Sequence, residues 1–524
     1  MWGTMPDVLD RACGYYSSSV AVVDGDRRIS YRELQDWSDQ IAHALVSLGV
    51  QKSERVGVLL PNSLEFIPTQ HGIWKAGGVL VQMPARAAAS VHRANLDQTA
   101  ATTLIYHSDF DGVVDALRDE LPKLDRFIRI GGDPADSADV AFDSLVSAQP
   151  TGRPAVEVTD DDEAYVLFTS GSTGEPKGVV QSHRTWCHYA IGAGLEIGDI
   201  RFGEVFAHGA PFTHFTQIFA MPTFLRGGTN VMLPGLEIDT LLGFVEKYGV
   251  TATAVVPTII YLLLDHPSRE QYDLSTLQTM IYAGSPIAPE RLRDALEVFG
   301  PIFIQTYAGT EQGYISCLRK NEHRVDTEDD VSRLASAGRP MFQVQVTIQD
   351  DQDNVLPQGE VGEICSQQLG QMLGYVDSSR NAETLRNGWV HTGDVGRIDE
   401  DGFLYLVDRK KDMIVSGGFN VFPRQVEDVL LQDPVVAQAA VVGIPHEKWG
   451  EAVHAFVVLK PDAHSKPGEF TATRLQDQVK ATLGSVCAPK TVDFLDDLPV
   501  NPAGKVDKKT LRAPFWEGHS RQIG

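Results

Sequence analysis

Residues 165–178 read YVLFTSGSTGEPKG, an apolar run followed by a loop of glycines and hydroxyl side chains that ends with a lysine. The run predicts a strand over 165–169, and a helix is expected from about Ser182. The same alternation continues, with strands predicted over 205–210, 229–233, 252–256, 280–283 and 302–305 and helices over 240–248 and 289–299. Such alternation indicates parallel sheets covered by helices, in which ligands bind beyond the carboxyl ends of the strands.

The segments on either side of this central part complete the predicted architecture. Upstream, Ser30 and Glu33 have the spacing of a capping box and predict a helix over 31–48. Other upstream expectations are strands over 55–60 and 79–83, a helix over 62–76 and an irregular excursion over 131–163. Short alternating strands between 337 and 407 indicate a small antiparallel or barrel-like subdomain. A compact α+β pattern follows the charged cluster 408–412.

We therefore predict an α/β fold with two domains, as expected for a chain of 524 residues. Residues 1–408 form a large N-terminal domain of parallel, helix-covered sheets that includes the small barrel-like subdomain. Residues 409–412 form a hinge, and residues 413–524 form a small mobile α+β domain. A homodimer is compatible with this architecture.

Composition narrows the class of protein. The formal net charge of −25 repels nucleic acid and anionic lipid, so neither is expected as a partner. The 5 cysteines are scattered without CxxC spacing, which argues against a disulfide framework or a zinc site. We see no signal peptide and no apolar run as long as a membrane span, so we expect a cytoplasmic protein without integral membrane association.

The glycine-rich loop suits a polyphosphate. Glycines let backbone N–H groups converge on an anion, and hydroxyl groups add donors. The loop is not a Walker A loop, because Gly178 rather than Ser or Thr follows Lys177. The alternative is a flexible surface turn. The residues with a proposed binding role are Thr169, Ser170, Gly171, Ser172, Thr173, Gly174 and Lys177.

A second polar cluster, QTYAGTE over residues 305–311, follows a predicted strand directly. A purine can stack on Tyr307, and the Glu311 carboxylate can hold Mg²⁺, which prefers oxygen ligands. The alternative is that Tyr307 is a core residue.

Two further motifs lie towards the C-terminus. In HTGD, residues 391–394, Asp394 can accept both ribose hydroxyls, and Arg409 can bridge to phosphate. In NPAGKVD, residues 501–507, a Pro/Gly turn presents Lys505 to an anion. The alternatives are a turn aspartate with a surface ion pair, and an ordinary surface lysine.

Together and in this order, the motifs resemble those of the adenylate-forming superfamily, which includes acyl- and aryl-CoA synthetases, peptide-synthetase adenylation domains and beetle luciferases. The resemblance covers nearly the whole chain. It implies an ATP- and Mg²⁺-dependent enzyme that converts a small-molecule carboxylic acid to its acyl-AMP and then transfers the acyl group to coenzyme A.

The resemblance also implies a role for each motif in the large domain. The loop 169–178 covers the β- and γ-phosphates. His214, in the segment PFTH, gates the acid pocket or lies beside the carboxylate. The backbone of 282–286 walls the adenine and the acyl pocket, with Gly284, Ser285 and Pro286 in contact with the ligands.

The roles implied for the remaining residues concern adenylation and domain motion. Tyr307 packs on adenine, Thr310 contacts the α-phosphate and Glu311 ligates Mg²⁺. Asp394 holds the ribose with Arg409 nearby. Lys411 falls at the hinge position, and Lys505 contacts the carboxylate and the α-phosphate during adenylation.

Two details bear on the acceptor and the acid. The segment SGGFNV, residues 416–421, resembles the CoA-ligase version of the motif that follows the hinge, in which Gly417 and Gly418 leave room for a pantetheine arm, and this favours coenzyme A. Ala308 stands where the family usually has glycine, and its methyl group is expected to narrow the acyl pocket. The acid itself stays open among aryl, medium-chain and polycyclic acids.

Two alternatives to a CoA ligase are open. The first is an adenylating enzyme that passes the acyl group to a carrier protein or another nucleophile. The second is a nucleotide-binding protein without ligase activity, which the joint presence of Glu311, Asp394, Arg409 and Lys505 argues against.

Overall fold

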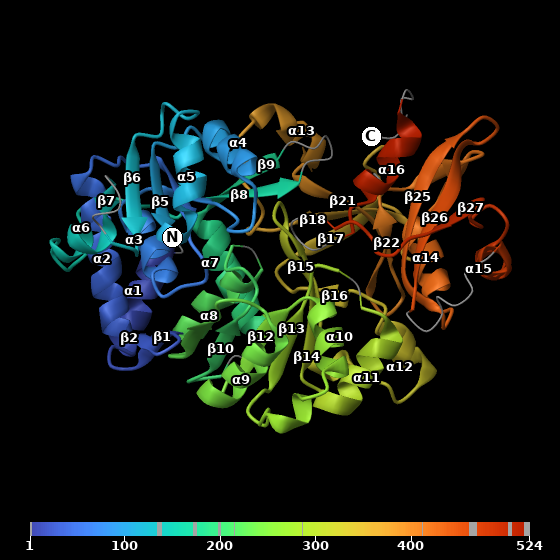
Figure 1. Ribbon diagram of the computed structural model, residues 1–524, viewed down its shortest axis with the longest axis horizontal. Coiled ribbons are helices and arrows are strands. Elements are labelled where there is room, and N and C mark those ends of the chain that lie inside the picture. Colours follow the sequence, from blue (N-terminus) through green and yellow to red (C-terminus); the bar gives the residue numbers. More distant parts are fainter. Residues whose placement is uncertain are drawn as a thin grey trace. The chain divides into compact units, whose positions relative to one another are not determined.

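The computed structural model describes residues 3–133, 139–170, 176–197, 201–213, 215–285, 287–410, 412–460, 469–500 and 506–517 (Figure 1). The chain divides into two compact units. The first comprises Met1–Val346, Ser366–His391 and Gly402–Leu404, and the second comprises Thr347–Cys365, Thr392–Asp401 and Tyr405–Gly524. The prediction that residues 409–412 form a hinge between two moving domains is not tested by this division and stays a prediction. Within the described ranges, every helix is too short or too polar to cross a membrane.

A nine-stranded sheet forms one half of the first unit, with strand order β16-β15-β14-β13-β12-β10-β11-β1-β2. Strands β14 through β1 of this order run parallel, and β2, β15 and β16 pair antiparallel at the two edges. The strands are β1 (Val20–Asp24), β2 (Arg27–Ser30), β10 (Val205–His208), β11 (Thr229–Met232), β12 (Ala252–Val255), β13 (Thr279–Tyr282), β14 (Phe303–Gly309), β15 (Gly313–Leu318) and β16 (Arg339–Pro340).

An eight-stranded sheet forms the other half, with strand order β19-β9-β8-β4-β3-β5-β6-β7. Strands β8 through β7 run parallel, whereas β9 and β19 are antiparallel additions. The strands are β3 (Arg55–Leu59), β4 (Val79–Gln82), β5 (Thr103–His107), β6 (Arg126–Ile130), β7 (Val140–Ala141), β8 (Glu163–Ser170), β9 (Pro176–Ser182) and β19 (Gly374–Tyr375).

Helices cover both faces of the eight-stranded sheet. Val79 and Val81 of β4 pack into one apolar cluster with residues of α4 and α5, whereas Leu80 between them packs into the other with residues of α2 and α3. The helices of the first unit are α1 (Met5–Tyr15), α2 (Tyr31–Ser47), α3 (Phe66–Lys75), α4 (Ala89–Thr99), α5 (Asp111–Arg118), α6 (Phe142–Ser147), α7 (His183–Gly192), α8 (Ala220–Leu225), α9 (Ile238–Tyr248), α10 (Pro257–Asp265), α11 (Pro289–Phe299), α12 (Glu328–Arg333) and α13 (Asn381–Thr384).

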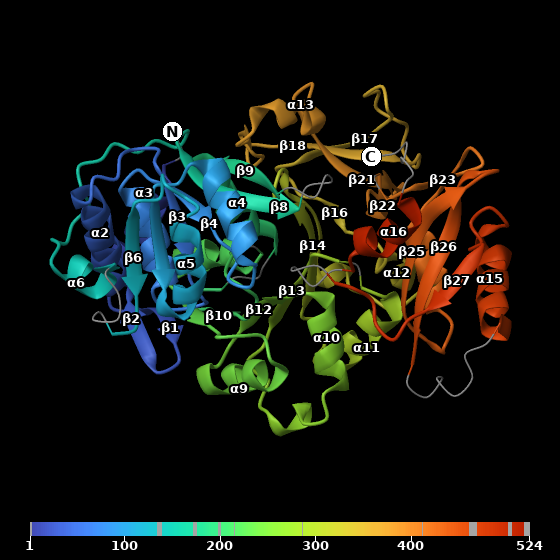
Figure 2. The same cartoon turned by 45° about the horizontal axis from the view of Figure 1, so that its top comes forward.

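A five-stranded sheet of order β17-β18-β21-β20, with β22 on β21, follows in the chain. Its strands are β17 (Gln345–Gln349), β18 (Gly362–Gln367), β20 (Leu385–Arg386), β21 (Trp389–Ile398) and β22 (Leu404–Arg409). The C-terminal part of the second unit has a sheet of order β24-β23-β26-β25, with β27 on β26 (Figure 2). Its elements are β23 (Ile414–Ser416), β24 (Phe419–Val421), α14 (Pro423–Leu431), β25 (Val436–His446), β26 (Gly450–Leu459), α15 (Glu469–Leu483), β27 (Thr491–Phe494) and α16 (Lys508–Trp516).

The predicted fold class is confirmed, and the differences are local. Ser30 caps α2 by accepting the N–H of Glu33 at 3.2 Å, while the Glu33 carboxylate accepts the N–H of Ser30 at 2.7 Å. The glycine-rich loop leads first into strand β9, which was not predicted, whereas α7 begins at His183, next to the predicted start at Ser182. The predicted excursion over 131–163 contains β7 and α6 among its described residues.

Candidate active site

A tight turn between β14 and β15 holds two of the predicted catalytic residues. Gly309 and Gly313 pair across the two antiparallel strands, so Thr310 and Glu311 lie in the connecting turn. The carbonyl oxygen of Thr310 accepts a hydrogen bond from Nε2 of Gln181 at 2.9 Å. A Cβ at Gly309 would lie 2.2 Å from the side-chain nitrogen of Gln312, so a larger residue here would displace that side chain. The turn is therefore fixed from β9 and from its own side chains.

The Glu311 carboxylate is held by two hydroxyl groups from distant strands. Its Oε1 accepts hydrogen bonds from Oγ1 of Thr169 and from the hydroxyl of Tyr375, both at 3.2 Å. Burial and the nearby charge of Glu311 raise the pKa of Tyr375, so the tyrosine stays a neutral donor. Neutral hydrogen-bond donors orient the Glu311 carboxylate without cancelling its charge. An oriented, charged carboxylate fits a Mg²⁺ ion, which prefers oxygen ligands. Sequence reasoning did not find Tyr375, which no motif marks.

Lys177 lies beside Tyr375, one of the two hydroxyl donors to the Glu311 carboxylate. It is paired with Thr169 across β8 and β9. Its Nζ is 3.0 Å from Oε2 of Glu383 and 5.2 Å from the ring centroid of Tyr375. Ser170 is the last residue of β8, and the predicted residues Gly171, Ser172, Thr173 and Gly174 lie outside the described residues. The structure thus brings the lysine of the loop and the predicted metal ligand to one place in the first unit.

The predicted adenine and acid walls follow the carboxyl ends of neighbouring parallel strands. Gly284 and Ser285 are exposed just beyond β13, and Gly284 has a φ of +89°, which favours glycine. On β14, Tyr307 is half-buried and Ala308 is exposed. Pro286 lies outside the described residues. The exposed positions are compatible with ligand contact.

Asn62 anchors the segment that precedes His214, which itself lies outside the described residues. Oδ1 of Asn62 accepts the N–H of Phe212 at 2.7 Å, and Nδ2 of Asn62 donates to the carbonyl oxygens of His208 and Ala210 at 3.1 and 3.0 Å. Burial lowers the pKa of His208 to about 4, so this histidine is neutral and structural. No local pattern marks Asn62, because its partners are about 150 residues away in the chain.

In the second unit, Asp394 and Arg409 form an ion pair. Nε of Arg409 is 3.3 Å from Oδ1 of Asp394. The preceding Gly393 has a φ of +71° and donates its N–H to Glu363 at 3.1 Å. Lys410 also binds Glu363, with its Nζ 3.2 Å from Oε2. These contacts hold the part of strand β21 that carries Asp394, and its role at the ribose stays a prediction.

Gly417 and Gly418 form the two-residue turn between β23 and β24. Ser416 pairs with Phe419, and the two glycines have φ values of +60° and +84°. A two-residue hairpin turn of this kind requires positive φ at both central residues. The backbone therefore needs glycine here, in addition to any space needed by a pantetheine arm.

The segment that carries Lys505 is closed at its base. Val500 pairs with Val506, and the N–H of Asp507 donates to the carbonyl oxygen of Pro499 at 2.7 Å. Lys505 and Lys411 themselves lie outside the described residues.

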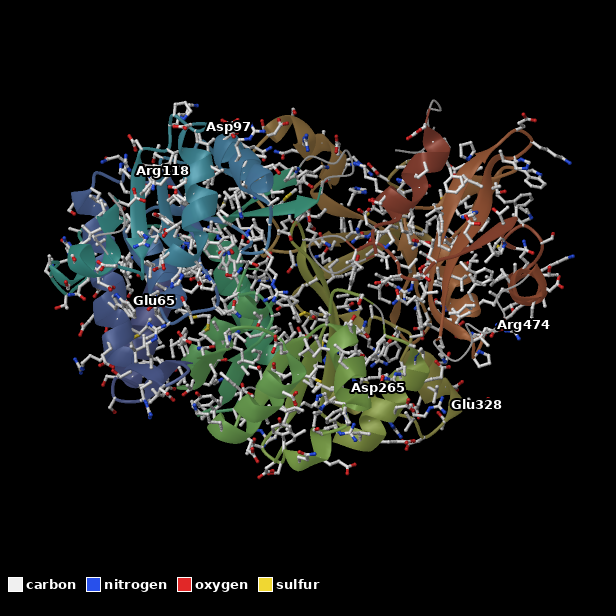
Figure 3. All side chains as sticks on the ribbon, viewed as in Figure 1. Glu65, Asp97, Arg118, Asp265, Glu328 and Arg474 are labelled. Carbon is white, nitrogen blue, oxygen red and sulfur yellow. The ribbon has the colours of Figure 1, made fainter. Side chains whose placement is uncertain are left out.

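The surface charge makes local donors necessary for anionic substrates. Exposed acidic side chains such as Asp97, Asp265 and Glu328 project from the first unit (Figure 3). Within the described residues, no group of three or more His, Cys, Asp or Glu side chains could hold a metal ion by itself. A metal at Glu311 would therefore share its coordination with substrate oxygens and water, as Mg²⁺ commonly does.

Comparison with known proteins covers both parts of the chain. The family model described as AMP-binding enzyme matches residues 9–376, and the one described as AMP-binding enzyme C-terminal domain matches residues 425–505. The medium/long-chain-fatty-acid–CoA ligase FadD8 of Mycobacterium tuberculosis is 37% identical over 513 residues, covering 95% of this chain and 88% of FadD8. The fatty acid–[acyl-carrier-protein] ligase ScoC of Streptomyces coeruleorubidus is 33% identical over 511 residues, covering 96% of this chain and 95% of ScoC.

A solved structure gives the same result for the fold. The amide bond synthetase McbA from Marinactinospora thermotolerans superposes with a TM-score of 0.87 at 29% sequence identity, covering 97% of this chain and 99% of McbA. The names of these three proteins give three different outcomes for the acyl group: a CoA ester, an acyl-carrier-protein ester and an amide.

Proposed function

Since the chain belongs to the family of AMP-binding enzymes, we propose that it is an acid–CoA ligase that works through an acyl-adenylate. In the first step, a carboxylate oxygen attacks the α-phosphorus of ATP and pyrophosphate leaves. In the second step, the thiol of coenzyme A attacks the acyl carbonyl and AMP leaves. The observation that carries the proposal is the cluster of Thr169, Glu311 and Tyr375 with Lys177 beside it.

This cluster suits the first step because both reactants are anions. Positive charge must screen them and hold them in line for displacement at phosphorus. Glu311 would hold Mg²⁺, which supplies part of that charge. Lys177 would contact the phosphates, and Thr310 would contact the α-phosphate from the same turn. Asp394 and Arg409 would hold the ribose and the phosphate chain.

The C-terminal lysine provides the remaining charge in this proposal. Lys505 would contact the acid carboxylate and the α-phosphate during adenylation. It would then leave when the domain 413–524 rotates about Lys411, which admits the thiol. His214 would lie at the acid pocket, in the segment that Asn62 anchors.

Coenzyme A is the proposed acceptor, and an apolar acid is the proposed substrate. The turn of Gly417 and Gly418 and the 37% identity to a CoA ligase favour the thiol of coenzyme A. A medium- or long-chain fatty acid is the first choice, because FadD8 is named for that class. The alternative acceptor is a carrier protein, which the 33% identity to ScoC favours.

One experiment tests both steps. Purified protein is incubated with ATP, Mg²⁺ and a panel of aliphatic, aryl and polycyclic acids, and pyrophosphate release is measured with and without coenzyme A. We expect acid-dependent release, and an acyl-CoA product when coenzyme A is present. If the protein releases pyrophosphate but forms no acyl-CoA, and acyl transfer appears when an acyl-carrier protein is added, the carrier protein is the acceptor. Failure of the whole panel to release pyrophosphate would refute the ligase proposal.

The Lys505→Ala variant tests the division of labour. Loss of one charge-assisted contact at a transition state typically costs about 10²–10³ in rate. We expect that loss in acid-dependent pyrophosphate release, and a much smaller effect on thioester formation from supplied acyl-AMP. Equal slowing of both half-reactions in a folded variant would contradict the proposed motion.

A further inference from the structure

A cluster of charged side chains in the second unit lies at the start of helix α16. Lys508, the first residue of α16, has its Nζ 2.7 Å from Oε1 of Glu427 on α14. The same oxygen accepts the N–H of Val441 on β25 at 2.7 Å. Burial acts to lower the pKa of Lys508, but the charges of Glu427, Asp408 and Asp412 raise it. The lysine is therefore a cation held among carboxylates.

Asp408 connects this cluster to the chain that enters the hinge segment. Its carboxylate accepts the N–H of Arg409 at 2.7 Å and the N–H of Arg424 at 2.9 Å. Arg424 is the second residue of α14, and the N-cap residue Phe422 makes no side-chain capping hydrogen bond. Asp408 thus satisfies a helix N–H and interacts favourably with the helix dipole.

Lys508 is three residues beyond Lys505 in the chain. Three residues extend at most about 11 Å, so the two lysines cannot move independently over long distances. Helix α16 is also held further along, where Leu511 packs into an apolar cluster and Nε1 of Trp516 donates to the carbonyl oxygen of Gly443 at 2.9 Å. Helix α16 is therefore held both at its start and further along.

We propose that Lys508 is a positioning residue that, through Glu427 and Asp408, holds the start of α16, three residues after Lys505 in the chain. The inference rests on the proposed function, in which Lys505 acts during adenylation. The Lys508–Glu427 pair is partly buried, and breaking it leaves charges without their partner, so the pair restrains the start of α16 more firmly than the chain alone. Asp408 is the neighbour of Arg409, which pairs with Asp394. The cluster thus joins Arg409 and Asp394 to the start of α16, and adenylation is the step that depends on it.

Four variants isolate this role. Lys508→Met keeps the length of the side chain and removes the charge, and Lys508→Arg keeps the charge. The double variant Lys508→Met/Glu427→Gln removes both charges and avoids a partly buried carboxylate at Glu427 that has lost its lysine. Lys509→Met is the matched control, because Lys509 is the adjacent lysine and is exposed.

The kinetic readout separates the two half-reactions. Lys508→Met should slow acid-dependent pyrophosphate release by roughly 10–100-fold, the effect of a small misplacement of a catalytic group. Thioester formation from supplied acyl-AMP should change little. Lys508→Arg should restore most of the rate, the double variant should share the defect, and Lys509→Met should match the wild-type protein.

Hydrogen exchange gives a readout that does not depend on catalysis. The backbone amides of residues 506–511 should exchange faster in Lys508→Met and in the double variant, and at the wild-type rate in Lys508→Arg and Lys509→Met. Unchanged exchange at these amides in a folded Lys508→Met protein would overturn the inference, as would equal slowing of both half-reactions. If the wild-type protein releases no pyrophosphate with any acid, the proposed function fails, and the exchange result still decides the positioning claim.

Discussion

Replacing Tyr375 by phenylalanine removes one hydroxyl group and leaves the ring in place. That hydroxyl is 3.2 Å from Oε1 of Glu311 and 3.1 Å from Oγ1 of Thr384. The ring lies 5.2 Å from Nζ of Lys177, and phenylalanine retains this contact. The substitution therefore tests the hydrogen bond to the Glu311 carboxylate rather than the packing around it.

The expected magnitude follows from the two donors to Glu311. Oε1 accepts from Thr169 and from Tyr375, so the variant loses one of the two hydroxyl donors that the described residues supply to the carboxylate. A hydrogen bond to a charged group contributes about 1.5–3 kcal/mol, and losing the partner of a metal-binding carboxylate weakens metal affinity by about 10–100-fold. We expect the Mg²⁺ concentration for half-maximal pyrophosphate release to rise roughly tenfold or more.

The assay is a Mg²⁺ titration of pyrophosphate release at saturating ATP and acid. Tyr248→Phe is the control, because that hydroxyl donates to the carbonyl oxygen of Gly25 at 2.6 Å and does not contact Glu311. Excess Mg²⁺ should restore most of the rate of Tyr375→Phe. A variant with the wild-type Mg²⁺ requirement would refute the assignment of Glu311 as a metal ligand oriented by Tyr375.

Three further predictions follow from residues described above. Ala308→Gly should admit bulkier acids, and an acid profile identical to that of the wild-type protein in the pyrophosphate assay would show that the methyl group lies away from the pocket. Asp394→Ala should raise the KM for ATP by about tenfold or more through loss of charge-assisted hydrogen bonds to ribose, with the KM for coenzyme A unchanged; unaltered ATP kinetics would exclude Asp394 from the site. Burial raises the pKa of Asp408 from 3.8 to about 6, so the folded protein binds this proton more tightly than the unfolded chain does. The resulting contribution to the free energy of unfolding is roughly 3 kcal/mol. It is fully present below pH 3.8 and is lost as the pH rises through about 6. Urea unfolding between about pH 4 and pH 7 should therefore show a smaller loss of stability in Asp408→Asn than in the wild-type protein.

Much of the parallel-sheet part could be predicted from local patterns. Helix α11 begins and ends where its apolar spacing and its proline predict, and the Ser30 capping box starts α2. Strand β9 was missed because its sequence, PKGVVQS, begins with residues that favour loops, and it is a strand only through pairing with β8. Pairing with β8 therefore outweighs the local preference of these residues for a loop.

The candidate site divides in the same way. Glu311 and Asp394 stand in recognisable motifs, so their types and spacing could be interpreted from the sequence. Tyr375 and Asn62 act through partners 64 and up to 150 residues away, and a single polar residue carries no sign of such a partner. Lys508 has the same character, since its partner Glu427 lies on another element.

The handedness of the turn at Gly417 and Gly418 has a consequence for reading this motif in other chains. A left-handed backbone disfavours most L-amino acids at both positions, whatever acceptor the enzyme uses, so the glycine pair reflects the bend as well as any opening that a thiol would need. Chemical synthesis separates the two meanings. D-Alanine at 418 satisfies the bend while placing a methyl group at the turn, where an L-methyl group would meet no atom within 4 Å. A protein with that residue would fold like the parent. Its thioester formation would be slower only if the incoming thiol needs the space that the methyl group fills.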